Sequence, residues 1–209
     1  MLTVVTPAAD LGLLTLDETK AATGVTGSAQ DPALETLRLR VAAIVAAECN
    51  VAAAGVRPVT LRQETLREVL RPARPTARLL LSRRPVVSVA SILVDGVALA
   101  EADYELDQAG AILCRLVDDT PAAWLPGKIV VEYVAGWGTV PDGLKLAAAK
   151  MALLIWSENG PSPRDPSIKR ERVDGVGEIE RWVGPDTDPA FPQEVKDLLR
   201  PYRNGRRWS

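Results

Sequence analysis

PVVSVASILVDGVALAEADYELDQAGAILCRLVDDTPAAWLPGKIVVEYVAGW, residues 85–137, changes the hydrophobic pattern of the chain from helical to strand-like and back. β-Branched residues dominate its first ten positions, and this run stops at Asp95-Gly96, the strongest short hairpin signal in the sequence. Extended patterns then resume at residues 104–106, 111–117 and 128–134. The stretch therefore predicts three or four antiparallel strands inserted between two helices.

Three main helices are expected around this β module. The first opens with Thr15 and Glu18, which have the spacing of a capping box. The second begins at Asp31-Pro32, with Asp31 as the cap and Pro32 at the first helical position, and ends at Gly55. The third begins at Pro141 and is closed by Gly160-Pro161.

The order of these elements predicts an α+β fold. Residues 1–160 form a helical domain, and residues 59–136 are the β module inserted into it. Within the module, residues 59–70 fit a strand or a helix, and we interpret them as an edge strand. Prolines and charges scatter through residues 161–209, which we interpret as an extended C-terminal arm with a helical turn or two at residues 194–199.

The composition argues against an enzyme. The 209 residues include no histidine, which removes His-based triads and His metal ligands, and the net charge of −2 does not suit a protein that coats nucleic acid. Two cysteines make no disulfide framework. We expect no signal peptide, because no basic region followed by an apolar run opens the sequence, and no apolar run is long enough to span a bilayer. We therefore expect an intracellular, non-enzymatic protein with no cofactor, no metal site and no membrane contact.

A set of ordered segments resembles the head–tail connector (adaptor) proteins of tailed bacteriophages and phage-derived gene transfer agents. The resemblance covers roughly residues 11–158. The segments that carry it are Leu14-Thr15-Leu16-Asp17-Glu18, the capped helix from Asp31, Pro85-Val86-Val87-Ser88-Val89, Val94-Asp95-Gly96, Ala102-Asp103-Tyr104-Glu105-Leu106, Val130-Val131-Glu132-Tyr133-Val134-Ala135-Gly136-Trp137, and Val140-Pro141 with the alanine-rich helix that follows.

The resemblance implies structural work at the head–tail interface of a virion or phage-like particle. Such adaptors form a ring, usually of twelve copies, beneath the portal protein. They extend the channel through which double-stranded DNA passes without sequence-specific binding, and they present a docking surface to a tail-side neck or tail-terminator protein. In that family a helical connector domain packs around the ring and the C-terminal segment reaches the portal.

The C-terminus offers the best candidates for partner binding. Four arginines and two aromatic residues lie in the last ten positions with no acidic residue among them: Arg200, Tyr202, Arg203, Arg206, Arg207 and Trp208. These residues could anchor a protein interface, contact DNA phosphates or form a solvated terminus, and we expect the interface. Trp182 is a further partner-contact candidate, because an aromatic residue in an extended segment needs a surface to pack on.

Two other functions remain open from the sequence. One is a neck or tail-completion protein of the same particle, which differs mainly in the neighbour that it touches. The other is a small enzyme or ligand-binding protein that uses carboxylates near the sheet, namely Asp103, Asp107, Asp118 and Asp119. We expect these four to serve turn geometry, Cys49 and Cys114 to be buried, and Trp124, Trp137 and Trp156 to be core or subunit-interface residues.

Overall fold

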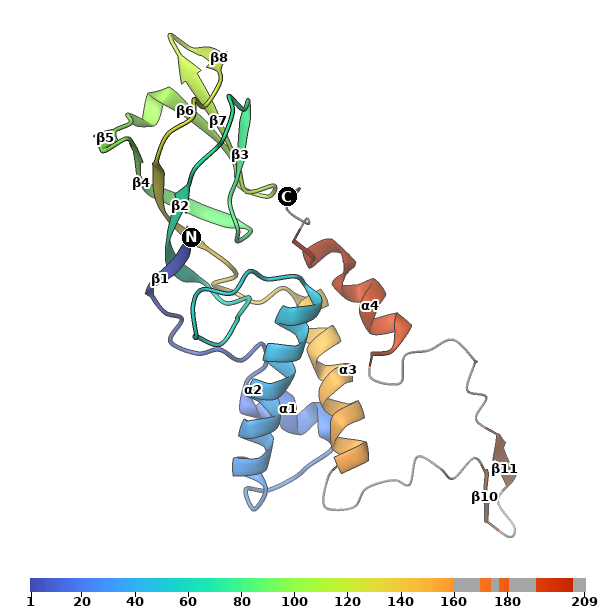
Figure 1. Ribbon diagram of the computed structural model, residues 1–209. Coiled ribbons are helices and arrows are strands. Elements are labelled where there is room, and N and C mark those ends of the chain that lie inside the picture. The colour runs from blue at the N-terminus through green and yellow to red at the C-terminus, as the bar shows by residue number, and fades with distance from the viewer. Residues whose placement is uncertain (160–169, 174–176, 181–190, 205–209) are drawn as a thin grey trace.

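The computed structural model describes residues 1–159, 170–173, 177–180 and 191–204 (Figure 1). Four α-helices gather at one end of the molecule and two β-sheets lie at the other. The helices are α1 (Leu16–Thr23), α2 (Asp31–Glu48), α3 (Asp142–Asn159) and α4 (Gln193–Leu199), and two 3-10 turns are η1 (Glu101–Asp103) and η2 (Arg200–Tyr202). Within the described residues, no helix has the length and hydrophobicity needed to cross a membrane.

The first helix begins as the sequence predicts. The Thr15 hydroxyl accepts the Glu18 backbone N–H at 3.1 Å, and the Glu18 carboxylate accepts the Thr15 N–H at 2.8 Å. This capping box satisfies two of the backbone donors that a helix N-terminus leaves free. Gly24 ends α1 in the left-handed conformation, with φ of 71°.

The second helix differs from the prediction at both ends. Gln30 holds the N-cap position, and Asp31 is already helical and pairs with Lys20 at 2.6 Å. The helix stops at Glu48, well before Gly55, because Asn50 takes a left-handed conformation with φ of 52°. Asparagine tolerates this conformation better than other non-glycine residues, so Asn50 is the C-terminal signal.

Both sheets are antiparallel. The first has the order β1 (Leu2–Thr6), β2 (Glu64–Leu70), β9 (Ile129–Ala135), β4 (Val86–Val94) and β5 (Val97–Ala98). The second has the order β3 (Arg78–Leu80), β7 (Ile112–Val117) and β6 (Tyr104–Asp107), with β8 (Thr120–Ala122) also paired to β7. A separate hairpin joins β10 (Arg170–Val173) to β11 (Gly177–Glu180).

The α+β fold with an antiparallel β module is confirmed, and the module contains more strands than expected. Residues 59–70 contain a strand as predicted, but the prediction that this strand lies at the edge of the sheet is wrong. This strand, β2, lies between β9 and the N-terminal strand β1, which pairs with it from Leu2 to Thr6. Five residues are too few for alternation to distinguish a strand from a loop in the sequence, so β1 was missed.

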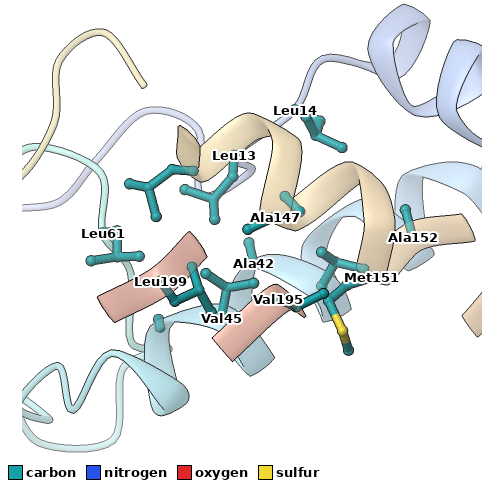
Figure 2. Packing of buried hydrophobic residues seen from close by; sticks show 14 of the residues in the cluster. Leu13, Leu14, Ala42, Val45, Leu61, Ala147, Met151, Ala152, Val195 and Leu199 are labelled. Carbon is teal, nitrogen blue, oxygen red and sulfur yellow. The ribbon is translucent and has the colours of Figure 1, made fainter. Parts of the chain in front are cut away.

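Two hydrophobic cores correspond to the two ends of the molecule. The helical core joins side chains from α2, α3 and α4 with Leu13, Leu14 and Leu61 from the connecting segments (Figure 2). The second core fills the space between the sheets around Trp124 and Tyr133, which are fully buried. Along β9 the residues alternate between buried and half-buried, the pattern of a sheet with one covered face.

Candidate functional site

The C-terminal segment folds back onto the helical domain. Val195 and Leu199 are four apart and share one face of the helix, and both join the helical core together with Phe191, which lies just before the helix. The helix expected at residues 194–199 is therefore present as α4. The structure differs from the predicted extended arm over residues 191–204, because this apolar face is buried against α2 and α3.

Three residues that follow α4 attach the C-terminal segment to the place where the helical domain meets the sheets. The Tyr202 ring meets the Trp137 ring edge-on, with centroids 5.9 Å apart, and Arg203 forms an ion pair with Glu48. The backbone N–H of Asn204 donates to the Cys49 carbonyl at 2.8 Å. We call Tyr202, Arg203 and Asn204 the C-terminal clasp.

The clasp closes the C-terminus of α2 and reaches the β module. The Asn204 side chain donates to the Asn50 carbonyl at 3.3 Å and accepts from Arg84 Nε at 3.2 Å. Helix C-termini leave carbonyl groups without helical partners, and here Asn204, more than 150 positions away, donates hydrogen bonds to the carbonyls of Cys49 and Asn50. Because Arg84 lies two residues before β4, the clasp links helices and sheet.

Replacing Tyr202 by alanine should lower the free energy of unfolding by about 1–3 kcal/mol, since it removes the ring contact with Trp137. Urea unfolding followed by tryptophan fluorescence measures the loss. Arg200→Ala, at an exposed neighbouring position, is the control and should stay within about 0.5 kcal/mol of the parent. An equally small effect at Tyr202 would mean that the contact does not hold the segment.

The structure places only some of the residues predicted to bind a partner. Tyr202 and Arg203 are half-buried and contact Trp137 and Glu48 of their own chain. Arg200 is exposed. Four further candidates lie outside the described residues: Trp182, Arg206, Arg207 and Trp208. Partner binding by these residues stays a prediction.

A buried ion pair lies at the boundary between the two ends of the molecule. Arg83 Nη1 is 3.5 Å from Glu64 Oε2, and both side chains are almost completely buried. Arg83 also donates to the carbonyls of Ala52 at 2.9 Å and Thr60 at 2.7 Å. Burial raises the pKa of Glu64, and Arg83 opposes that shift, while burial lowers the pKa of Arg83. The pair fixes the loop after α2 to the first strands of the β module.

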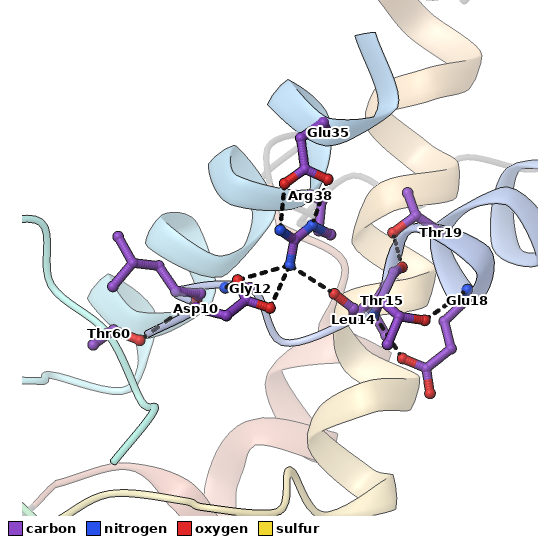
Figure 3. Close-up of polar contacts among 10 residues, drawn as sticks. Asp10, Gly12, Leu14, Thr15, Glu18, Thr19, Glu35, Arg38 and Thr60 are labelled. Atoms are coloured by element: carbon purple, nitrogen blue, oxygen red, sulfur yellow. Dashed lines mark hydrogen bonds and ion pairs between the residues drawn. The ribbon is translucent and has the colours of Figure 1, made fainter. Parts of the chain in front are cut away.

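A second arginine organises the N-terminal segment (Figure 3). Arg38, on α2, donates to both carboxylate oxygens of Asp10 at 2.9 Å, to the Leu14 carbonyl at 3.1 Å and to Glu35. The pKa of Asp10 is lowered, because hydrogen bonds from Gly12 and Arg38 outweigh the opposing effect of burial. Arg38 thereby positions the segment between β1 and α1 on the helical domain.

A third polar group is enclosed between the sheets. The Glu68 carboxylate accepts hydrogen bonds from the Ser82 backbone N–H at 2.9 Å, the Ser82 hydroxyl at 2.5 Å and the Tyr133 hydroxyl at 2.9 Å. Burial and the neighbouring carboxylate raise the pKa of Tyr133 far above its ordinary value. Sequence reasoning missed Glu68, because one carboxylate in an alternating strand does not reveal which side of the sheet is covered.

The carboxylates that could have supported an enzyme lie at turns. Asp107 accepts the Gly110 N–H at 3.0 Å, and Asp118 and Asp119 have positive φ at the β7–β8 turn. Asp103 closes the 3-10 turn η1. Among the described residues, no three acidic or cysteine side chains are grouped as metal ligands would be. These aspartates serve backbone geometry, as predicted.

The cysteines and tryptophans differ in their surroundings. Cys49 is fully buried, and this burial raises the pKa of its thiol to about 12. Cys114 was predicted to be buried too, but it is only half-buried. Cys114 lies on β7, where one strand face is less covered. Trp124 is completely buried, and Trp137 and Trp156 pack partly buried against the helical core.

Exposed leucines mark one face of α3. Leu146 and Leu153 are seven residues apart, so they lie on the same face, and each is about half exposed (48% and 51%). Ion pairs border this face on both sides: Lys145 with Glu18 of α1, and Lys150 with Glu194 of α4, each at 2.7 Å. An apolar stripe with a charged border is typical of a contact surface.

Comparison with known proteins finds one matching family, described as head completion protein, over residues 12–159. Three similar solved chains come from the neck of an empty GTA particle computed with C6 symmetry, a native gene transfer agent (GTA) virion, and the neck of a native GTA particle computed with C12 symmetry. Their TM-scores are 0.59, 0.55 and 0.58, and their identities are 22%, 20% and 18%. Each alignment covers 99% of this chain and 96% of the other. No curated protein matches the chain. At these identities the solved chains show a shared fold.

Proposed function

Because the chain belongs to the head completion protein family, a family of structural proteins and not of enzymes, we propose that it is a neck adaptor of a phage-like particle. In this proposal twelve copies form a ring between the portal and the tail. The ring continues the DNA channel and presents a docking surface to a tail-side neck or tail-terminator protein.

The full-length likeness to neck chains carries the proposal. The alignments cover 99% of this chain and 96% of the solved chains, so the likeness includes both the helices and the β module. Two of those necks were computed with C6 and C12 symmetry, which supports a cyclic arrangement for this chain too. The GTA origin of all three supports a phage-like particle.

The surface of the helical domain supports contacts between copies. Leu146 and Leu153 expose an apolar stripe, and α2 exposes Leu39 together with small residues at Ala43 and Ala47. Slim helix faces allow close packing against a neighbour. The long helices and the β module would therefore both contribute lateral contacts in the ring.

We place the portal contact in the C-terminal segment beyond the clasp. Arg206, Arg207 and Trp208 follow Asn204 after a single glycine, and Asn204 is anchored at the junction of helices and sheets. Arginine and tryptophan are enriched among residues that dominate interface energies. Trp182 is the second candidate, in the segment between α3 and α4.

Co-sedimentation with purified portal rings, followed by electron microscopy, tests the proposal. We expect a ring of this chain stacked coaxially on the portal. Deleting residues 205–209 should weaken binding at least tenfold while leaving thermal stability unchanged, because α4 and the clasp remain in place. A larger deletion from residue 193 is unsuitable, since it removes the buried Val195 and Leu199 from the core.

Arg200→Ala is the matched control, because Arg200 is exposed but precedes the clasp. It should bind the portal as the parent does. Unchanged binding by the shortened chain would remove the C-terminal contact from the proposal. Absence of any portal complex across a range of salt concentrations would contradict the adaptor function and favour a tail-completion role, which binding to tail-side proteins would reveal.

A further inference from the structure

The strands at the margins of the sheets differ in how well they are protected against pairing. Natural proteins protect an exposed edge by charge, proline or brevity. Strand β6 carries Glu105 and Asp107, β3 contains Arg78, β8 contains Pro121, and β5 has only two residues. Strand β1, with the sequence Leu-Thr-Val-Val-Thr, has five residues and none of these features.

The outer side of β1 presents free backbone groups. Met1 and Val69 exchange both hydrogen bonds, each at 2.8 Å, so they form a hydrogen-bonded pair of the antiparallel ladder. Along an antiparallel ladder, hydrogen-bonded pairs alternate with pairs that are not hydrogen-bonded. Leu2 and Val4 belong to pairs of the second kind, so their N–H and C=O groups point away from β2. No other strand of the described chain lies on that side, and β1 is at the margin of the sheet (Figure 1).

The opposite margin of the same sheet has a matching gap. Strand β4 runs from Val86 to Val94, but β5 pairs only with its last two residues, Leu93 and Val94. Gln108 bonds to the backbone of Val86 and Val87. Residues 88–91 are left without a strand partner on this side in the described chain, and their sequence, Ser-Val-Ala-Ser, contains no charge and no proline. Their only protective feature of the kinds that edge strands use is an irregularity in the pairing with β9, between Val89 and Ser91.

We propose that β1 of one copy pairs with residues 88–91 of β4 in the next copy, so that the five-stranded sheets join into a continuous sheet around the assembly. This inference rests on the proposed ring. The partner is a second copy because the same sheet carries both unprotected margins at its two opposite sides. Pairing between two different margins is head-to-tail: each added copy leaves one β1 margin and one β4 margin free at the ends of the row. Further copies can therefore add in the same way until the ring closes.

Strand direction supports this arrangement. The order β1, β2, β9, β4 is antiparallel at every step, so β1 and β4 run in opposite directions within one copy. Neighbours in a twelve-membered ring differ by a rotation of only about 30°. A neighbour displaced sideways with little rotation therefore brings its β1 antiparallel to β4, which continues the alternation of the sheet.

Mixing two proteins on portal rings, each with one introduced cysteine, tests the pairing. One protein carries Thr3→Cys and the other Ala90→Cys, both in a Cys114→Ser background, because Cys49 is buried and unreactive. A disulfide between the two proteins can form only between copies. We expect it at least tenfold above a control mixture in which Glu105→Cys, on the charged β6 edge, replaces Thr3→Cys.

Hydrogen exchange provides a second readout that needs no substitution. The amides of Leu2 and Val4 should exchange at least tenfold more slowly in the ring than in the free chain. A ring on the portal with neither the disulfide nor the protection would overturn the pairing and leave the adaptor function intact. Disulfide formation and amide protection in self-assembled copies that do not bind the portal would support the pairing and contradict the adaptor function. If the chain forms no ring on the portal and shows neither the disulfide nor the protection in any other assembly, both the pairing and the adaptor function are contradicted.

Discussion

Replacing Gly136 by alanine should lower the free energy of unfolding by about 3 kcal/mol or more. Gly136 ends β9 with φ of 101°, a conformation that L-residues rarely adopt. A Cβ there would lie 2.4 Å from the Arg62 carbonyl oxygen and 2.8 Å from its carbon. Both are backbone atoms, so no side-chain rotation relieves the clash.

The Arg62 backbone is itself held in place. The Trp137 N–H donates to the Leu61 carbonyl at 2.8 Å, and the Gln63 N–H donates to the Trp137 carbonyl at 3.2 Å. These bonds fix the point at which the chain leaves the sheet and enters α3. Alanine at Gly136 would have to break them, so we also expect weaker ring formation.

Gly24→Ala is the matched control for this prediction. Gly24 also has positive φ, 71°, but a Cβ there would meet no atom within 4 Å. It should cost only about 1–2 kcal/mol, the cost of the left-handed conformation for a residue with a side chain. Chemical denaturation of both variants compares the two costs. Equal losses would show that the close approach to Arg62 has no energetic consequence.

Local signals in the sequence were enough to predict most of the elements. The capping box at Thr15 and Glu18, the hairpin at Asp95-Gly96 and the alternation along β9 each depend on residues a few positions apart. In each case the short-range chemistry and the final packing favour the same conformation, which is why the prediction succeeds. The turn geometry of the aspartates was predictable for the same reason, because it also depends on residues a few positions apart.

Elements that depend on distant partners were not predictable in this way. Strand β1 is stabilised by pairing with residues 65–68, which are 59–66 positions away. The docking of α4 depends on a few apolar residues within a proline-rich segment, and on the α2 terminus that accepts the clasp. Neither leaves a periodic signal long enough to recognise.

The buried charges show the same limit at the candidate site. Glu64, Glu68 and Arg83 are ordinary polar residues in the sequence, yet each is almost completely buried. Sequence reasoning considered carboxylate chemistry only for the turn aspartates, which it expected to serve turn geometry, and did not identify these three. Only the fold brings Arg83 to Glu64, because the pairing of β2 with β9 turns Glu64 toward the covered face.

Replacing Arg83 by methionine should destabilise the chain by about 3–5 kcal/mol at pH 7, because the buried Glu64 carboxylate loses the arginine with which it forms an ion pair. Two carbonyls, of Ala52 and Thr60, would also lose their hydrogen bonds from the guanidinium. Urea unfolding measures the loss. Arg67→Met is the control: Arg67 pairs with Glu132 at 3.6 Å but is more than half exposed, so its loss should be below about 1 kcal/mol.

The pH dependence distinguishes the effect of the unpaired Glu64 charge from the effect of the hydrogen bonds lost at the carbonyls of Ala52 and Thr60. Burial raises the pKa of Glu64 above its ordinary value of 4.5, and without Arg83 it should rise further. The folded state then binds more protons than the unfolded state, so stability increases as pH falls from the raised pKa toward 4.5, by about 1.4 kcal/mol per pH unit. The deficit of Arg83→Met relative to the parent should therefore shrink on acidification, whereas Asp10 and Glu18, whose pKa values are lowered, affect both proteins alike.

Adding Glu64→Gln to Arg83→Met completes this experiment. Glutamine keeps the shape of the glutamate side chain but carries no charge, so the double variant should recover about 1–3 kcal/mol at pH 7. Its deficit relative to the parent should also stop shrinking as pH falls. A double variant no more stable than Arg83→Met would show that the cost lies in the two unpaired carbonyls. Arg83 would then stabilise the chain through its hydrogen bonds to the loop after α2, and not by neutralising the charge of Glu64.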